Sequence, residues 1–177
     1  LDKRSNQPMQ DGQGQYWIVF NGEIYNYKIL QNELIDDGVT FKTKSDTEVI
    51  LKGFEIYGLD WFRRLNGMFS IAIYDKINKS VTLARDRFGI KPLYYCLNAG
   101  FLHFGSEQRA IQSYPTVAAD NISRKAFLEY FHFGYSLESA AFLEKIIQVP
   151  SGSTLTMSLG GQPIIRKFYS FPLPKYK

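Results

Sequence analysis

The chain carries two stretches that decide how the rest of it is interpreted, NGEIYNY at residues 21–27 and RDRFGIKPLYY at residues 85–95. The first follows the apolar run YWIVF at residues 16–20, which is typical of a buried strand. Asn-Gly after a strand is also the commonest hairpin signal, so Asn21 and Gly22 alone favour a plain turn. The complete seven-residue string favours another role, because a simple hairpin has no need for Glu-Ile-Tyr-Asn after its turn.

Hydrophobic periodicity and turn residues predict the elements around these stretches. Helices are expected between residues 26 and 37, between 45 and 58, at 106–113 and, capped by Ser123, at 124–133. Ser45 and Glu48 form the pattern of a capping box. Strands are expected at 16–20, 39–44, 68–74, 80–84, 93–97, 101–104, 153–158 and 163–169. The short turns between strands indicate antiparallel pairing, so the sequence predicts a layered α+β domain.

Composition excludes several classes of protein. With 177 residues, of which 45% are hydrophobic, the chain is long enough for one substantial core. A net charge of +4 without a block of like charges does not indicate a nucleic-acid partner. No apolar stretch is long enough to span a membrane, and one cysteine cannot form an internal disulfide. These features predict a cytoplasmic domain without a membrane partner.

Together the two stretches resemble the glutamine-binding domain of glutamine-hydrolysing asparagine synthetases, which is a class II, N-terminal-nucleophile glutamine amidotransferase. The resemblance runs from residue 7 to residue 169. It implies an N-terminal-nucleophile hydrolase fold of four αββα layers with stacked antiparallel sheets, here N-terminally incomplete. We therefore expect an amidotransferase domain at residues 1–170 and the start of a linker to a synthetase domain at residues 171–177.

The resemblance also implies site residues. Asn21 and Gly22 match the catalytic oxyanion hole of the family, and a side-chain amide and a glycine N–H are suitable donors for that purpose. Glu23 and Asp46 match the two carboxylates that bind the α-ammonium group of glutamine. Asp46 also stands in the first turn of a predicted helix, where the helix dipole favours a carboxylate without any further role.

The nucleophile of the family is an N-terminal cysteine whose own α-amino group acts as general base. The one cysteine here is Cys96, inside an apolar stretch, and a buried inert thiol is the favoured interpretation. The matching cysteine segment and the arginine that holds the substrate carboxylate are absent from the sequence. We therefore expect the chain as given to be inactive. Because the leading segment of the family also supplies strands to the sheets, we expect its absence to expose sheet edges and make the chain poorly soluble. The alternative is a non-catalytic glutamine-binding or structural remnant.

The remaining expectations concern partners and cofactors. The resemblance implies glutamine as nitrogen donor and a synthetase domain, in cis or in trans, that amidates a carboxylate, by default that of aspartate. ATP and magnesium are expected only in that second domain, and the chain could form a homo-oligomer. His103 and His132 are too far from Cys96 in sequence to suggest a metal site. The stretch Arg85-Asp86-Arg87 is expected to form a structural ion-pair network near the pocket wall.

Overall fold

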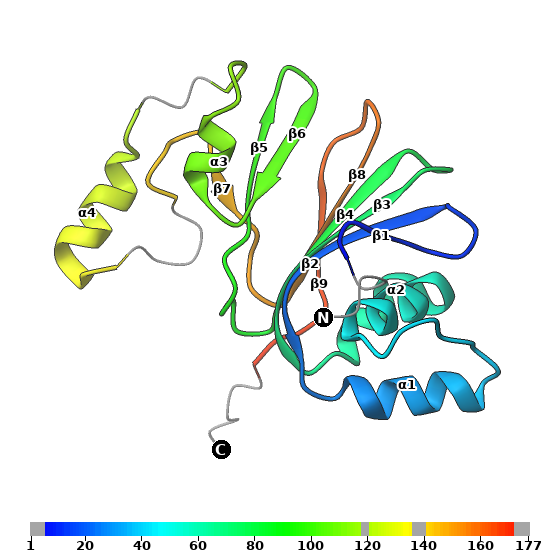
Figure 1. Ribbon diagram of the computed structural model, residues 1–177. Helices are drawn as coiled ribbons and strands as arrows, with labels where there is room; N and C mark the ends of the chain where they lie inside the picture. The colour runs from blue at the N-terminus through cyan, green and yellow to red at the C-terminus, as the bar shows by residue number, and fades with distance from the viewer. Residues whose placement is uncertain (1–5, 118–120, 136–140, 172–177) are drawn as a thin grey trace.

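Two antiparallel sheets with helices on their outer sides make up the computed structural model, which describes residues 6–117, 121–135 and 141–171 (Figure 1). The larger sheet has the order β1-β2-β3-β4-β8-β9 and the smaller one the order β6-β5-β7. The strands of the larger sheet are β1 (Met9–Gln10), β2 (Tyr16–Ile24), β3 (Gly67–Asp75), β4 (Ser80–Arg85), β8 (Ser153–Ser158) and β9 (Ile164–Lys167). Those of the smaller sheet are β5 (Tyr94–Asn98), β6 (Phe101–Gly105) and β7 (Ile147–Gln148).

The helices lie in two groups, one beside each sheet (Figure 1). Beside the larger sheet are α1 (Tyr27–Asp36), α2 (Asp46–Tyr57) and the 3₁₀ helix η2 (Gly58–Arg63). Beside the smaller sheet are α3 (Gln108–Gln112) and α4 (Arg124–Phe133). The layers therefore follow the predicted α+β order of helices, sheet, sheet and helices.

Apolar side chains fill the spaces between these layers. The main core lies between the larger sheet and its helices and includes the fully buried Trp61, Phe62 and Phe69. A second cluster, with Leu83 and Leu155, lies on the other face of the same sheet and reaches Tyr95 of β5. A third surrounds Cys96 and Ile111 beneath α3. The two sheets thus share one interior, as expected for a single domain of this length.

Most predicted elements are confirmed, and three predictions need correction. Residues 39–44 are not a strand, because the Glu48 carboxylate accepts the backbone N–H groups of Lys42 and Thr43 at 2.8 and 2.6 Å. Ser45 does cap α2, accepting the N–H of Glu48 at 3.2 Å, so only half of the expected capping box forms. The strand at 16–20 does not stop at Asn21 but continues to Ile24.

Among the described residues, no helix is both long and apolar enough to cross a membrane. The predicted linker at 171–177 falls, apart from Phe171, outside the described residues.

We expect Gly53→Ala to destabilise the protein, although alanine is the better helix former by about 1 kcal/mol. Gly53 lies within α2, and a Cβ there would come within 1.8 Å of the Trp61 ring, which is fully buried. Overpacking of this kind costs about 1–3 kcal/mol. Urea unfolding should show a net loss. Gly38→Ala meets no atom within 4 Å, so any loss there comes from its φ of +89° and not from overpacking. A stability gain for Gly53→Ala would contradict the contact with Trp61.

Candidate active site at the end of strand β2

The backbone of β2 directs the N–H of Gly22 away from β3. Gly22 lies opposite Phe69, whose own N–H and C=O both bind Asp86, the N–H at 3.2 Å and the C=O at 2.9 Å. A strand residue points both backbone groups to one side, so Gly22 and Phe69 form a pair without mutual hydrogen bonds. The Gly22 N–H therefore points to the opposite edge of β2, where β1 pairs with Ile18.

Neighbouring N–H groups on this edge bind side-chain oxygens. Phe20 donates to Oε1 of Gln7 at 2.6 Å, and Ile24 donates to Oδ2 of Asp46 at 3.3 Å. Gly22 stands between these two residues, with N–H groups on one side of a strand spaced about 7 Å apart. The edge thus presents a row of three donors, two of which already hold an oxygen acceptor.

Asp46 is the first residue of α2, and its carboxylate connects the helix to β2. Besides the bond from Ile24, its Oδ1 accepts the N–H of Thr47 at 2.9 Å. Partial burial raises the pKa of Asp46, the two backbone hydrogen bonds lower it, and the charge of Glu23 raises it again, with a net upward shift. Glu23 is therefore close enough for its charge to act on Asp46. The two carboxylates gather negative charge at one place.

Asn21 and Glu23 are both exposed and lie on one face of β2, since alternate strand residues share a face. Gly22 separates them and contributes its N–H from the strand edge. The structure thus brings together the four residues that the sequence predicted, three from β2 and one from the start of α2. Their roles in binding and catalysis stay predictions.

Gly22 also has a structural requirement of its own. Its φ is +149°, and a Cβ at this position would lie 2.0 Å from the carbonyl oxygen of Met68 on β3. Gly67, opposite Ile24, is equally confined, with a Cβ position 2.1 Å from the carbonyl oxygen of Glu23. The backbones of β2 and β3 approach too closely here for any other residue.

The second sequence motif supports the first through Asp86. This fully buried carboxylate accepts the N–H groups of Phe69, Phe88, Ile90 and Lys91 at 2.9–3.2 Å. Arg85 beside it donates to the carbonyl oxygens of Lys91, Gly89 and Val149 at 2.7–2.9 Å. Both charged side chains thus bind the backbone of the loop and its neighbours. Asp86 also holds Phe69, the residue of β3 that lies opposite Gly22.

The end of the first motif is held by Asn26, a role that the sequence did not reveal. Its side-chain amide donates to the carbonyl oxygen of Arg64 at 3.0 Å and accepts the N–H of Asn66 at 2.9 Å. The N–H of Tyr25 donates to the carbonyl oxygen of Asn66 at 2.7 Å. These bonds join residues about 40 positions apart, so no local pattern could have shown them.

The other polar candidates lie elsewhere. Cys96 is fully buried on β5, and burial raises the pKa of its thiol while Lys145 lowers it to a smaller extent. His103 is its cross-strand partner on β6, and His132 is on α4. Within the described parts of the chain, no three His, Cys, Asp or Glu residues are placed to hold a metal ion.

Comparisons with known proteins agree with this architecture. The glutamine amidotransferase domain family matches residues 1–169. Asparagine synthetase [glutamine-hydrolyzing] 1 of Bacillus subtilis is 35% identical over 169 residues, which is 94% of this chain and 26% of that protein. Putative asparagine synthetase [glutamine-hydrolyzing] 2 of Methanocaldococcus jannaschii is 34% identical over 161 residues, covering 90% of this chain and 30% of that protein. The chain thus spans less than a third of these relatives' length.

Solved structures confirm the expected N-terminal-nucleophile hydrolase fold. Glutamine phosphoribosylpyrophosphate amidotransferase from B. subtilis superposes with a TM-score of 0.62 at 20% identity, over 92% of this chain and 32% of that one. A structure described as the allosteric regulatory enzyme of purine biosynthesis gives 0.64 at 19% identity, over 94% and 32%. Identities this low establish only the fold. The match to the domain family over residues 1–169 assigns the family. The chain belongs to the glutamine amidotransferase domain family.

Proposed function

We propose that the protein releases ammonia from glutamine and that a synthetase domain uses this ammonia for the ATP-dependent amidation of a carboxylate, with aspartate as the default acceptor. The observation that carries the proposal is the group of polar side chains and N–H donors at the end of β2 and the start of α2. The Gly22 N–H points outward beside the exposed Asn21, and the carboxylates of Glu23 and Asp46 follow at the next positions.

These groups complement the two ends of glutamine. The carboxylates of Glu23 and Asp46 bind the α-ammonium group, since paired negative charge favours a cation. Asn21 Nδ2 and the Gly22 N–H donate to the amide oxygen at the other end, where negative charge develops during attack. The spacing of about 7 Å between alternate strand N–H groups is similar to the separation of the α-nitrogen and the amide oxygen in an extended glutamine molecule.

The reaction assigned to this site is amide hydrolysis through a thioester. A thiolate adds to the amide carbon, and the amide oxygen becomes an oxyanion held by Asn21 and Gly22. The nitrogen then takes up a proton, the C–N bond breaks, and ammonia leaves. Water then hydrolyses the thioester to glutamate. The resemblance to the family implies an N-terminal cysteine as the nucleophile, so Cys96, buried in β5, has no part in this step.

The proposal extends to the cofactors and location of the whole protein. ATP and magnesium serve the synthetase domain, and glutamine hydrolysis in this domain uses neither. The protein acts in the cytoplasm in asparagine biosynthesis, and a homo-oligomer is compatible with that role. The relatives named as glutamine-hydrolysing asparagine synthetases support this assignment.

Isotope transfer tests the proposed function. The full-length protein is incubated with glutamine labelled with nitrogen-15 in its amide, aspartate, ATP and magnesium. We expect labelled asparagine and one equivalent of glutamate. Labelled ammonia without asparagine would keep the glutaminase and reject aspartate as acceptor. Absence of both products, with glutamine binding retained in calorimetry, would support the non-catalytic alternative.

Asp46→Asn should raise the KM for glutamine about tenfold, because a neutral amide attracts the ammonium group less than a carboxylate does. Since the pKa of Asp46 is raised, its carboxylate takes up a proton at a pH above the ordinary aspartate pKa of about 3.9. Protonation removes the negative charge, so KM in the parent protein should rise as the pH falls through this raised pKa. In Asp46→Asn this part of the pH profile should disappear.

Two variants complete that measurement. Glu23→Gln should also raise KM and, by removing a like charge, move the Asp46 limb of the pH profile to lower pH. Asp36→Asn, an exposed carboxylate of α1, serves as the matched control and should leave KM unchanged. An unaltered KM in both Asp46→Asn and Glu23→Gln would remove these residues from the site.

A further inference from the structure

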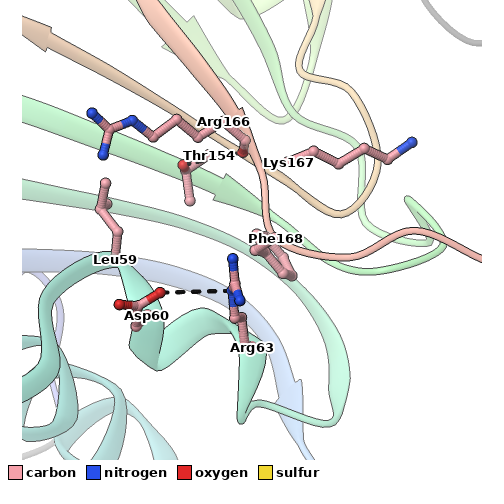
Figure 2. A pocket seen from close by; sticks show the side chains of 7 residues that line it. All are labelled: Leu59, Asp60, Arg63, Thr154, Arg166, Lys167 and Phe168. Atoms are coloured by element: carbon pink, nitrogen blue, oxygen red, sulfur yellow. Dashed lines mark hydrogen bonds and ion pairs between the residues drawn. The ribbon is translucent and has the colours of Figure 1, made fainter.

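A cleft opens between η2 and the edge strand β9, apart from the glutamine site. Its volume is about 380 Å³, and its lining residues are Leu59, Asp60, Arg63, Thr154, Arg166, Lys167 and Phe168 (Figure 2). One wall is the 3₁₀ helix, and the other consists of β9 with the neighbouring residue of β8. In Figure 2 the side chains of Arg166, Leu59, Asp60 and Arg63 surround the open space, while Lys167 extends away from it.

Two guanidinium groups and one carboxylate face this cleft. Arg63 and Asp60 lie 3.6 Å apart, with side chains 64% and 84% exposed. Ion pairs this exposed contribute little, so both groups can exchange partners at small cost. Within the described residues, the Arg166 guanidinium has no hydrogen-bond or ion-pair partner. Its backbone is held, because the carbonyl oxygen of Arg166 accepts the hydroxyl of the buried Thr154 at 3.4 Å.

We propose that this cleft binds an acidic α-amino acid, aspartate or glutamate. Such a ligand has two carboxylates and one ammonium group, which is the inverse of the two arginines and one aspartate in the cleft. Arginine binds carboxylates through paired N–H donors, and a separate arginine is available for each carboxylate. The ammonium group takes the place of Arg63 beside Asp60.

The shape of the cleft agrees with this class of ligand. Leu59 lies between Asp60 and Arg166 in Figure 2, where it offers an apolar contact for the methylene groups of the ligand. The volume exceeds that of an amino acid, so bridging waters complete the contacts. A simple polyanion fits less well, because it has no ammonium group to occupy the place beside Asp60, which repels it.

This inference does not rest on the proposed function, because it uses none of Asn21, Gly22, Glu23 or Asp46. It assigns a second amino-acid site, on the helical side of β8 and β9. Phe168 of the cleft packs against Phe69 with ring centroids 6.4 Å apart, and Phe69 is the partner of Gly22 in the sheet. The cleft and the glutamine site therefore share a neighbour.

Calorimetry on the full-length protein, with L-aspartate, L-glutamate and succinate as probes, tests the assignment. Aspartate or glutamate should bind, and succinate, which lacks the ammonium group, should bind about tenfold more weakly. Arg63→Gln and Arg166→Gln should each weaken aspartate binding about tenfold. Asp60→Asn should weaken aspartate binding but not succinate binding.

Matched controls separate the cleft from general surface charge. Arg124→Gln and Asp36→Asn alter exposed side chains on α4 and α1 and should leave aspartate binding unchanged. Absence of aspartate and glutamate binding up to about 10 mM would overturn the proposal. Because the proposed function also gives the synthetase domain an aspartate site, the cleft is identified by the component of the aspartate isotherm that Arg63→Gln and Arg166→Gln weaken. An aspartate isotherm that neither arginine variant alters would overturn the proposal, as would equal affinities of that component for succinate and aspartate.

Discussion

Asp86→Ala should lower the free energy of unfolding by about 3–5 kcal/mol, measured by urea denaturation. The substitution removes a fully buried carboxylate that accepts four backbone N–H groups. An unsatisfied buried donor costs about 1–3 kcal/mol. Water can reach the N–H groups of the exposed Phe88 and Ile90, but the N–H of Phe69 lies in the core. The expected loss of stability is therefore larger than the cost of one unsatisfied N–H group and well below the sum for four.

The same substitution should also weaken glutamine hydrolysis. The Asp86 carboxylate accepts the N–H of Phe69, the residue opposite Gly22, and the substitution removes this bond but keeps the one from the Asp86 backbone N–H to the Phe69 carbonyl oxygen. Loss of the side-chain bond should loosen Phe69 and with it the neighbouring Gly22. Asp36→Ala, which removes an exposed carboxylate of α1, should change the stability by no more than about 0.5 kcal/mol. If Asp86→Ala costs less than about 1 kcal/mol, the loop at 86–91 is held by other contacts.

Local signals in the sequence predicted the elements that depend on local contacts. Ser123 caps α4 through the N–H of Ala126 at 3.3 Å, and the helix runs over the predicted residues 124–133. The hairpin of β3 and β4 likewise follows from alternation and a short turn. In these cases each residue's neighbours in sequence are also its partners in space.

Predictions failed where a side chain outside the segment decided its structure or where an element was too short to show a pattern. Residues 39–44 alternate like a strand, yet the Glu48 side chain from α2 takes the N–H groups that a neighbouring strand would need. The two-residue strands β1 and β7 are too short to give a periodic signal. The 3₁₀ helix η2, which forms one wall of the proposed amino-acid cleft, was also missed, because its apolar residues Trp61 and Phe62 pack against the core from a short turn.

The sequence likewise predicted one part of the candidate site and not the other. Its residue types came from a resemblance in two motifs, and their placement in space could not have been derived from either motif alone. Asp86, which belongs to the second motif, binds Phe69 on β3, and Phe69 is the residue opposite Gly22 of the first motif. Spatial coupling between two motifs explains why both are needed for one site.

Asn21→Ala should reduce kcat for glutamine hydrolysis about 100- to 1,000-fold, because it removes one donor to the oxyanion. The KM should change little, since this donor acts mainly when negative charge develops on the amide oxygen. Asn21 is exposed on β2, and among the described residues its side-chain amide has no hydrogen-bond partner. The substitution should therefore leave the urea midpoint unchanged, which separates a catalytic loss from an unfolding loss.

Gly22→Ala cannot serve the same purpose, because its Cβ would meet the Met68 carbonyl oxygen at 2.0 Å and disturb the pairing of β2 with β3. The matched control is Asn32→Ala, an exposed asparagine of α1 that should retain full activity. A kcat for Asn21→Ala within about threefold of the parent value would exclude Asn21 from the oxyanion hole. A loss of kcat in Asn21→Ala with a rise of KM in Asp46→Asn would instead place the amide and the ammonium group of glutamine at opposite ends of one site.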